Sequence, residues 1–193
     1  MKLKITGGAF KGRYIEAPTG KNTRPTSEKL RKSIFDICQN YIEDTVVLDL
    51  FSGSGAMGLE AISRGAKTSY LVDNELNTQK CILKTINCLG VANEVHLLRM
   101  DVLKAIDKLE TDNSKFDLIF IDPPYATTSE SISLAEKTLY KLDNSSLITA
   151  TTVIFLEEGR YFNPDRAFSN LKNLKLRKLR TYGESNIYEI VIT

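Results

Sequence analysis

The chain has 193 residues, of which 42% are hydrophobic and 26% are charged, and its formal net charge is +2. This length predicts one domain with at most a short appendage, and the apolar content excludes disorder as the main state. No long apolar run and no signal-peptide core occur, so we expect a cytoplasmic protein with no membrane-spanning helix. The cysteines lack CxxC spacing and His96 is the single histidine, so the sequence has no metal-binding pattern.

The charges are distributed unevenly along the chain. Residues 1–40 carry nine Lys or Arg against three acidic residues, and residues 160–193 carry seven against three. Residues 41–159 carry ten against eighteen. Basic ends around an acidic middle favour a catalytic body with arms for a polyanion such as nucleic acid. Lysines that merely solvate the surface are the alternative explanation.

The first predicted elements are a small hairpin over residues 3–18 and a helix that follows a polar loop over residues 19–24. Alternating residues and the pairs Gly7-Gly8 and Lys11-Gly12 indicate the hairpin. We expect the helix to begin at Thr26 or Ser27. Apolar residues at helical spacing predict its inward face: Leu30, Ile34, Ile37 and Tyr41. Its basic residues lie mostly outside that face: Lys29, Arg31 and Lys32.

From Val46 the pattern changes to alternating strands and helices. Strands are predicted over residues 46–50, 70–72, 95–100, 116–121, 153–156, 174–179 and 187–192, and helices over 59–64, 75–89, 102–109 and 131–142. Repeated β-α units with buried strands predict an α/β fold: a mostly parallel seven-stranded sheet with helices on both faces and an antiparallel edge strand. We place a boundary near Asp44, between an N-terminal hairpin-and-helix arm (1–44) and the body (45–193).

A glycine-rich turn follows the first strand of the body. Gly53, Gly55 and Gly58 form a GxGxxG pattern between a predicted strand and a predicted helix. Glycines allow a tight turn and close approach of a ligand, and the following helix N-terminus supplies amide donors. In this strand-turn-helix context, the pattern predicts a nucleotide or cofactor site.

Two carboxylates end the next two strands. Asp73 is placed to accept hydrogen bonds from both hydroxyls of a ribose. This position suits the ribose of NAD and that of S-adenosylmethionine equally. Asp101 is placed to accept from an adenine amino group. The alternative for each is a helix cap, because a predicted helix begins just after it.

The sequence Asp122-Pro123-Pro124-Tyr125 follows the fourth strand of the body. Two consecutive prolines remove two amide donors and impose an extended turn, which leaves backbone carbonyls free to accept from a ligand. Asp122 adds a carboxylate, and Tyr125 adds a ring that can stack on a flat base. The set fits a planar substrate with an exocyclic amino group.

These motifs together resemble a known family. Asp-Pro-Pro-Tyr is similar to the motif of class I S-adenosylmethionine-dependent methyltransferases that act on a base amino group. The segments Ile5 to Arg13, Arg24-Pro25-Thr26, Leu30 to Phe35 and Leu48 to Ala66 resemble the RsmD-type bacterial 16S rRNA guanine-N2 methyltransferases. Thr6 stands where a basic residue is more common in that family. The resemblance implies a Rossmann-like class I methyltransferase fold and guanine 966 of 16S rRNA, free or within a small-subunit particle, as the target.

The resemblance also implies roles for individual residues. The methionine end of the cofactor would be lined by Asp49, Phe51, Ser52, Gly53 and Gly55. The ribose would be held by Asp73 with Asn74 nearby, and the adenine would lie between Asp101 and Val102. The guanine would be held by Asp122 and the Pro123 carbonyl and would stack on Tyr125. We expect the basic arm residues Lys11, Arg13, Arg24, Arg31 and Lys32 to contact RNA phosphates.

Three other functions compete with this one. A DNA adenine-N6 or cytosine-N4 methyltransferase would normally add a target-recognition domain, for which we expect no space in 193 residues. An NAD-dependent oxidoreductase accounts for the glycine turn and Asp73 but leaves Asp-Pro-Pro-Tyr and the basic arm unexplained. A non-catalytic RNA-binding protein with a relic pocket would not need the full set of pocket residues.

Overall fold

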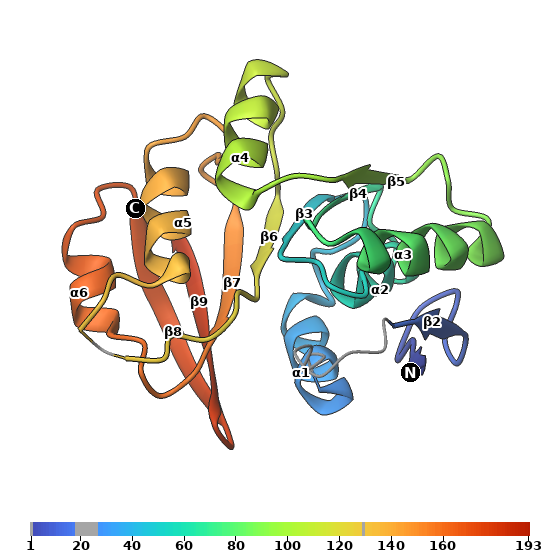
Figure 1. Ribbon diagram of the computed structural model, residues 1–193, viewed down its shortest axis with the longest axis horizontal. Coiled ribbons are helices and arrows are strands. Elements are labelled where there is room, and N and C mark those ends of the chain that lie inside the picture. Colours follow the sequence, from blue (N-terminus) through green and yellow to red (C-terminus); the bar gives the residue numbers. More distant parts are fainter. Residues whose placement is uncertain (1, 18–26, 129) are drawn as a thin grey trace. The chain divides into compact units, whose positions relative to one another are not determined.

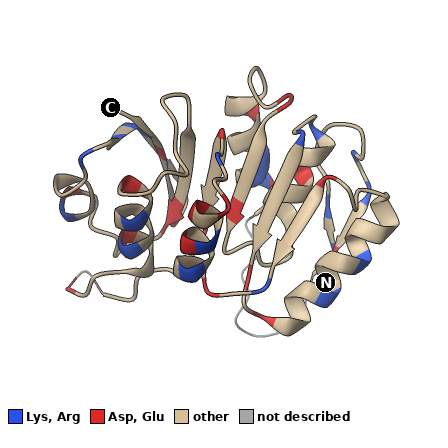
Figure 2. Ribbon diagram, turned by 90° about the horizontal axis from the view of Figure 1, so that it is seen from above, with Lys and Arg blue, Asp and Glu red and all other residues tan. Residues whose placement is uncertain are grey.

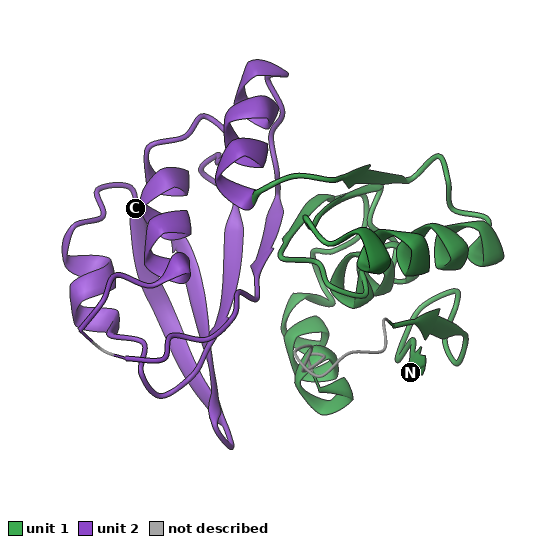
Figure 3. Cartoon of the chain, in the orientation of Figure 1, with its two compact units in different colours: residues 1–101 green, residues 102–193 purple. Residues whose placement is uncertain are grey.

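The computed structural model describes residues 2–17, 27–128 and 130–193. The chain divides into two compact units, residues 1–101 and 102–193 (Figure 3). The boundary near Asp44, between the arm and the body, stays a prediction. The predicted arm belongs to the first unit because the apolar side of its hairpin is buried there, as described below.

The first unit begins with the predicted hairpin and continues with alternating helices and strands (Figure 1). Its elements are β1 (Lys2–Lys4), β2 (Tyr14–Glu16), α1 (Glu28–Cys38), β3 (Val46–Leu50), α2 (Ala56–Ser63), β4 (Thr68–Val72), α3 (Leu76–Leu89) and β5 (Val95–Leu98). Strands β1 and β2 pair antiparallel, and β5, β4 and β3 lie in that order as parallel neighbours. Ser27 caps α1 by accepting from the Leu30 amide. Ser27 is one of the two residues that the sequence offers as the cap.

The core of the first unit joins the hairpin to the body. Ile5 and Ile15 are fully buried and cluster with Leu59, Leu71 and Ile82, which come from α2, β4 and α3. Burial of each of these side chains contributes about 1.5–3 kcal/mol to the stability of the fold. The hairpin is therefore fixed against α2 and α3 by its own apolar face.

The second unit contains the remaining strands of the predicted sheet. Its elements are α4 (Val102–Thr111), β6 (Leu118–Ile121), α5 (Leu134–Asp143), β7 (Val153–Glu158), α6 (Pro164–Ser169), β8 (Leu174–Tyr182) and β9 (Ser185–Ile192). Strand β6 pairs parallel with β7, and β9 pairs antiparallel with both β7 and β8. Helix α6 is not among the elements expected from the sequence, because its six residues are too few to show a helical period.

The predicted fold class is confirmed: the strand topology is that of a mostly parallel seven-stranded sheet with an antiparallel edge. All the predicted strands and helices occur, with ends that differ by a few residues. In the described part of the chain, no helix combines the length and apolarity needed to cross a bilayer.

Candidate functional site

The glycine turn of the first unit has the tight geometry that the sequence predicts. Gly53 and Gly55 adopt positive φ angles of 51° and 75°, and Phe51, which is not a glycine, has a φ of 66°. The Ser52 amide donates to the Val72 carbonyl at 2.9 Å, which fastens the turn to the end of β4. A non-glycine residue in the left-handed region costs free energy, and such residues concentrate at ligand sites.

Asp49 and Gly58 join the end of β3 to the start of α2. The Gly58 amide donates to Asp49 Oδ2 at 3.0 Å. A Cβ atom on Gly58 would lie 2.1 Å from Leu71 Cδ2, so only glycine allows this approach. Asp49 is 1% exposed, and this burial raises its pKa to about 7, although the Gly58 amide opposes the shift. The third glycine of the pattern thus serves the packing of helix on strand.

Asp73 connects the glycine turn to the end of β4. Its Oδ2 accepts from the Gly53 amide at 2.9 Å, and its Oδ1 accepts from the Glu75 amide at 2.8 Å. Burial raises the pKa of Asp73, and the two amides oppose that shift. This contact is not the helix cap offered as the alternative, because the N-cap residue of α3 is Glu75 and no side chain caps that helix. Each carboxylate oxygen has a second lone pair, so these two bonds leave capacity for the hydroxyls of a ribose.

Ser52 provides the test of whether a cofactor fits this turn. Its side chain is 8% exposed, and its Oγ has no hydrogen-bond partner among the described residues. A buried hydroxyl without a partner is costly unless a ligand supplies one. An added Cβ on Gly53 would meet the Phe51 carbonyl oxygen only at 3.9 Å, so nothing crowds the turn there, and the Ser52 hydroxyl fits a polar group bound at the turn.

The predicted adenine residues occupy different environments. Asn74 and Asp101 are exposed, at the ends of β4 and β5, and Val102 is buried as the first residue of α4. Their contacts with an adenine ring stay predictions.

In the second unit, the Asp-Pro-Pro-Tyr turn begins directly after the fully buried strand β6. Pro123 is buried, Pro124 is exposed, and Asp122 and Tyr125 are partly exposed. The turn therefore leaves an acidic side chain and an aromatic ring accessible at the carboxyl end of a strand, where α/β folds bind ligands.

The hydroxyl of Tyr125 is anchored at its far end. It donates to Glu157 Oε1 at 2.5 Å and lies 2.7 Å from Ser185 Oγ. A Cβ on Gly159 would lie 2.6 Å from Tyr125 Cδ2, so the ring packs closely on this glycine. Burial and the bond to Glu157 raise the pKa of Tyr125, which keeps the phenol neutral. Sequence reasoning missed Glu157 and Ser185, because neither lies near the turn in the chain.

Glu158 fixes the other end of the same turn. Its Oε2 accepts from the Ala126 amide at 3.2 Å and from the Gly159 amide at 3.0 Å. Its side chain is fully buried, which raises its pKa despite those two amides. Adjacent carboxylates at the end of β7 thus hold Tyr125 and the residue after it. Two consecutive glutamates that end a buried strand are the signal that could have revealed them.

The predicted RNA-contacting residues are distributed over the hairpin and α1. Lys11, Arg13 and Lys32 are exposed, and Arg24 lies outside the described residues. Arg13 Nη2 also donates to the Cys88 carbonyl at 2.9 Å. Figure 2 shows Lys and Arg on elements of both units. The presence of basic residues alone therefore does not mark an RNA-binding surface.

The prediction for Arg31 is wrong. Its side chain is completely buried, donates to the Lys4 carbonyl, and pairs with Glu60 Oε2 at 3.3 Å. Burial lowers the pKa of Arg31, and Glu60 opposes that shift. A buried, paired guanidinium has no surface for a phosphate. The spacing of apolar residues in the predicted helix does not indicate that Arg31 is buried, because its partner, Glu60, lies in another helix.

Glu60 joins the hairpin, α1 and α2 in one network. Besides Arg31, it accepts from the Thr6 amide at 2.8 Å, from Thr6 Oγ1 at 2.6 Å and from Arg64 Nε at 2.9 Å. Thr6 is the position at which the sequence departs from the related family. Its hydroxyl and amide satisfy a buried carboxylate, so the threonine has a structural reason.

Comparison with known proteins identifies the family. The family model described as Conserved hypothetical protein 95 matches residues 3–191. Ribosomal RNA small subunit methyltransferase D of Buchnera aphidicola (strain APS) is 37% identical over 159 residues, which cover 82% of this chain and 79% of that protein. The chain belongs to the RsmD-type methyltransferase family. The resemblance seen in the arm, the glycine turn and Asp-Pro-Pro-Tyr is thereby confirmed.

Solved structures share the fold of this chain. The Escherichia coli protein yhhF, named as a methyltransferase, superposes with a TM-score of 0.81 at 22% identity, covering 100% of this chain and 98% of that chain. The structure of SMU.776 complexed with SAH has a TM-score of 0.65 at 18% identity and covers 83% of this chain and 49% of that chain. At these identities, both comparisons establish the class I methyltransferase fold alone.

Proposed function

We propose that the chain transfers a methyl group from S-adenosylmethionine to the exocyclic N2 amino group of a guanine in 16S rRNA, guanine 966 in the family's naming. Membership of the RsmD-type family and the names of its curated relatives support methylation of small-subunit rRNA. The observation that carries the choice of an amino group on a flat base is the anchored Tyr125 ring beside Asp122 at the end of β6.

The residues of the first unit fit the methyl donor. S-adenosylmethionine, when bound, supplies an electrophilic methyl group on a positively charged sulfur. Ser52 Oγ suits its amino-acid end, and the remaining lone pairs of Asp73 suit its ribose. Asp49 contributes a carboxyl that a nearby positive charge would convert to the ionised form.

The residues of the second unit suit the amino group that is methylated. The N2 lone pair of guanine is delocalised into the ring and is a poor nucleophile. Asp122 and the Pro123 carbonyl would each accept one N–H, which fixes the group and restores lone-pair character. Orientation of this kind contributes up to about 7–11 kcal/mol to a displacement reaction. The methylated nitrogen can lose its proton after transfer, so the site needs no strong base.

Tyr125 would hold the base by stacking. Its hydroxyl is occupied by Glu157 and Ser185, so the ring face, rather than the phenol, is the part left for a substrate. Stacking of a base on an aromatic ring contributes about 1–3 kcal/mol. A guanine must leave its own stack to reach such a ring, which costs less in an RNA loop than in a helix.

The experiment that tests this function is methyl transfer to 16S rRNA that lacks the modification. The purified chain is incubated with this RNA and labelled S-adenosylmethionine, and the nucleosides are identified by mass spectrometry. We expect N2-methylguanosine at one position, formed at least about 10²-fold more slowly by the Asp122→Ala variant. Label on another base, or none with an enzyme that binds the cofactor, would refute the proposed function.

A further inference from the structure

The outer face of the hairpin carries a tyrosine between two lysines. Strand pairing places Leu3 opposite Ile15 and Lys4 opposite Tyr14. Because side chains alternate across a strand, Ile15 enters the core while Tyr14, Lys2 and Lys4 occupy the opposite face. Tyr14 is 56% exposed, so most of its ring is available to a partner.

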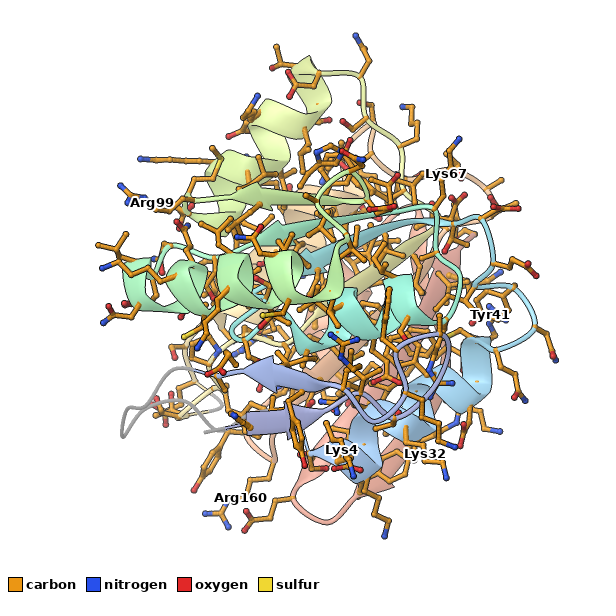
Figure 4. The ribbon with its side chains drawn as sticks, turned by 90° about the vertical axis from the view of Figure 1, so that its right-hand side faces the viewer. Lys4, Lys32, Tyr41, Lys67, Arg99 and Arg160 are labelled. Atoms are coloured by element: carbon orange, nitrogen blue, oxygen red, sulfur yellow. The ribbon has the colours of Figure 1, made fainter. Side chains whose placement is uncertain are left out.

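The two lysines lie around the Tyr14 ring. Lys2 Nζ is 5.8 Å and Lys4 Nζ is 6.0 Å from the ring centroid. These distances are at the outer limit of cation–π contact, so a base could displace either ammonium at little cost. Figure 4 shows Lys4 on the hairpin and Lys32 on α1, both on the lower side of the first unit in that view.

The positive charges of this face are not neutralised within the described residues. Glu16 lies opposite Lys2 in the hairpin, but its carboxylate pairs with Lys84 of α3 at 3.3 Å. No acidic side chain in residues 2–17, 27–128 and 130–193 forms an ion pair with Lys2 or Lys4. An exposed ring flanked by uncompensated cations has the chemistry of a single-stranded nucleic acid platform.

We propose that Tyr14, Lys2 and Lys4 form a stacking site for an unpaired nucleotide of the RNA substrate. The base would stack on the Tyr14 ring, and the lysines would contact the phosphates on either side of that nucleotide. This proposal rests on the proposed function and adds a second base-binding site, distinct from Tyr125, in the arm. Stacking is independent of sequence, so the site selects an unpaired nucleotide rather than a particular base.

The test compares variants of two equally exposed tyrosines. Tyr14→Leu removes the ring but keeps an apolar side chain, and Tyr14→Phe keeps the ring. Tyr140→Leu is the matched control, because Tyr140 is 59% exposed on α5. Binding to an unmodified 16S rRNA fragment is measured by fluorescence anisotropy at several salt concentrations, and melting curves and cofactor affinity verify folding.

We expect Tyr14→Leu to weaken RNA binding about tenfold, in the range of one lost stacked base. The slope of log affinity against log salt concentration should be the same for Tyr14→Leu as for the wild type. Tyr14→Phe and Tyr140→Leu should bind the RNA as tightly as the wild type does. Lys2→Ala with Lys4→Ala should reduce the slope by up to about 1.4. If Tyr14→Leu binds as tightly as the wild type, this proposal is overturned while the proposed function stands. If the wild type neither binds nor methylates the RNA, both fall.

Discussion

The hydroxyl of Tyr125 donates to Glu157 Oε1 at 2.5 Å, across 32 positions of the chain. This bond, with Ser185 Oγ at 2.7 Å, fixes the ring from the side opposite to its Cβ. The hydroxyl therefore positions the ring and does not supply a proton to the reaction. The raised pKa of Tyr125 agrees, because the phenol stays protonated at neutral pH.

This division of roles predicts a difference between two Tyr125 variants. Tyr125→Phe keeps the stacking face but leaves buried Glu157 without this donor, which should cost about 1–3 kcal/mol of stability. We expect most of the activity to remain in Tyr125→Phe and to be lost in Tyr125→Ala. Melting curves and kcat/KM measure the two effects. A folded Phe variant as inactive as the Ala variant would show that the hydroxyl matters in the reaction.

Asp73 is predicted to bind the ribose of the cofactor. Asp73→Ala should weaken S-adenosylmethionine binding by about 1.5–3 kcal/mol, the loss typical of hydrogen bonds to a charged group. It also removes the acceptor of the Gly53 amide, so the melting temperature is measured alongside. Asp165→Ala, at an exposed position in α6, is the control. Calorimetry that finds unchanged affinity in folded Asp73→Ala excludes this role.

The pKa of Asp49 predicts a pH dependence of cofactor binding. Because burial raises this pKa to about 7, the carboxyl of the free protein is mostly protonated at pH 6. A bound sulfonium favours the ionised form and lowers the pKa. Binding at pH 6 should therefore release a proton, and affinity should rise as the pH increases from about 5 to 8.

Calorimetry in two buffers of different ionisation enthalpy measures that proton. The observed enthalpy should differ between the buffers for the wild type and should be the same for Asp49→Asn. Equal enthalpies for the wild type at pH 6 would mean that Asp49 does not respond to the cofactor.

The exposed basic residues of the arm predict a salt effect. Replacing Lys11 and Arg13 by alanine should weaken RNA binding and reduce the slope of log affinity against log salt by up to about 1.4. Cofactor affinity should be unchanged. If the hairpin only packs on the body, the double variant melts at a lower temperature and keeps the wild-type slope.

Local patterns were sufficient to predict the elements and the glycine turn. Gly53 and Gly55 occupy positive φ angles, and Ser27 caps α1, because such features depend on residues close in the chain. Contacts between distant residues could not be predicted in this way. Arg31 is paired in the interior with Glu60, which is 29 positions away in the chain. Glu157 reaches Tyr125 only after β7 has paired with β6.

The central claim is that the Asp-Pro-Pro-Tyr turn presents a guanine N2 amino group for methylation. The most direct test is nucleoside mass spectrometry of 16S rRNA from cells that lack the gene, complemented with the wild type or with Asp122→Ala. The wild type should restore one N2-methylguanosine. The variant should restore it at least about 10²-fold more slowly while binding the cofactor normally. Full restoration by Asp122→Ala, or no loss of N2-methylguanosine in the deletion strain, would contradict the claim.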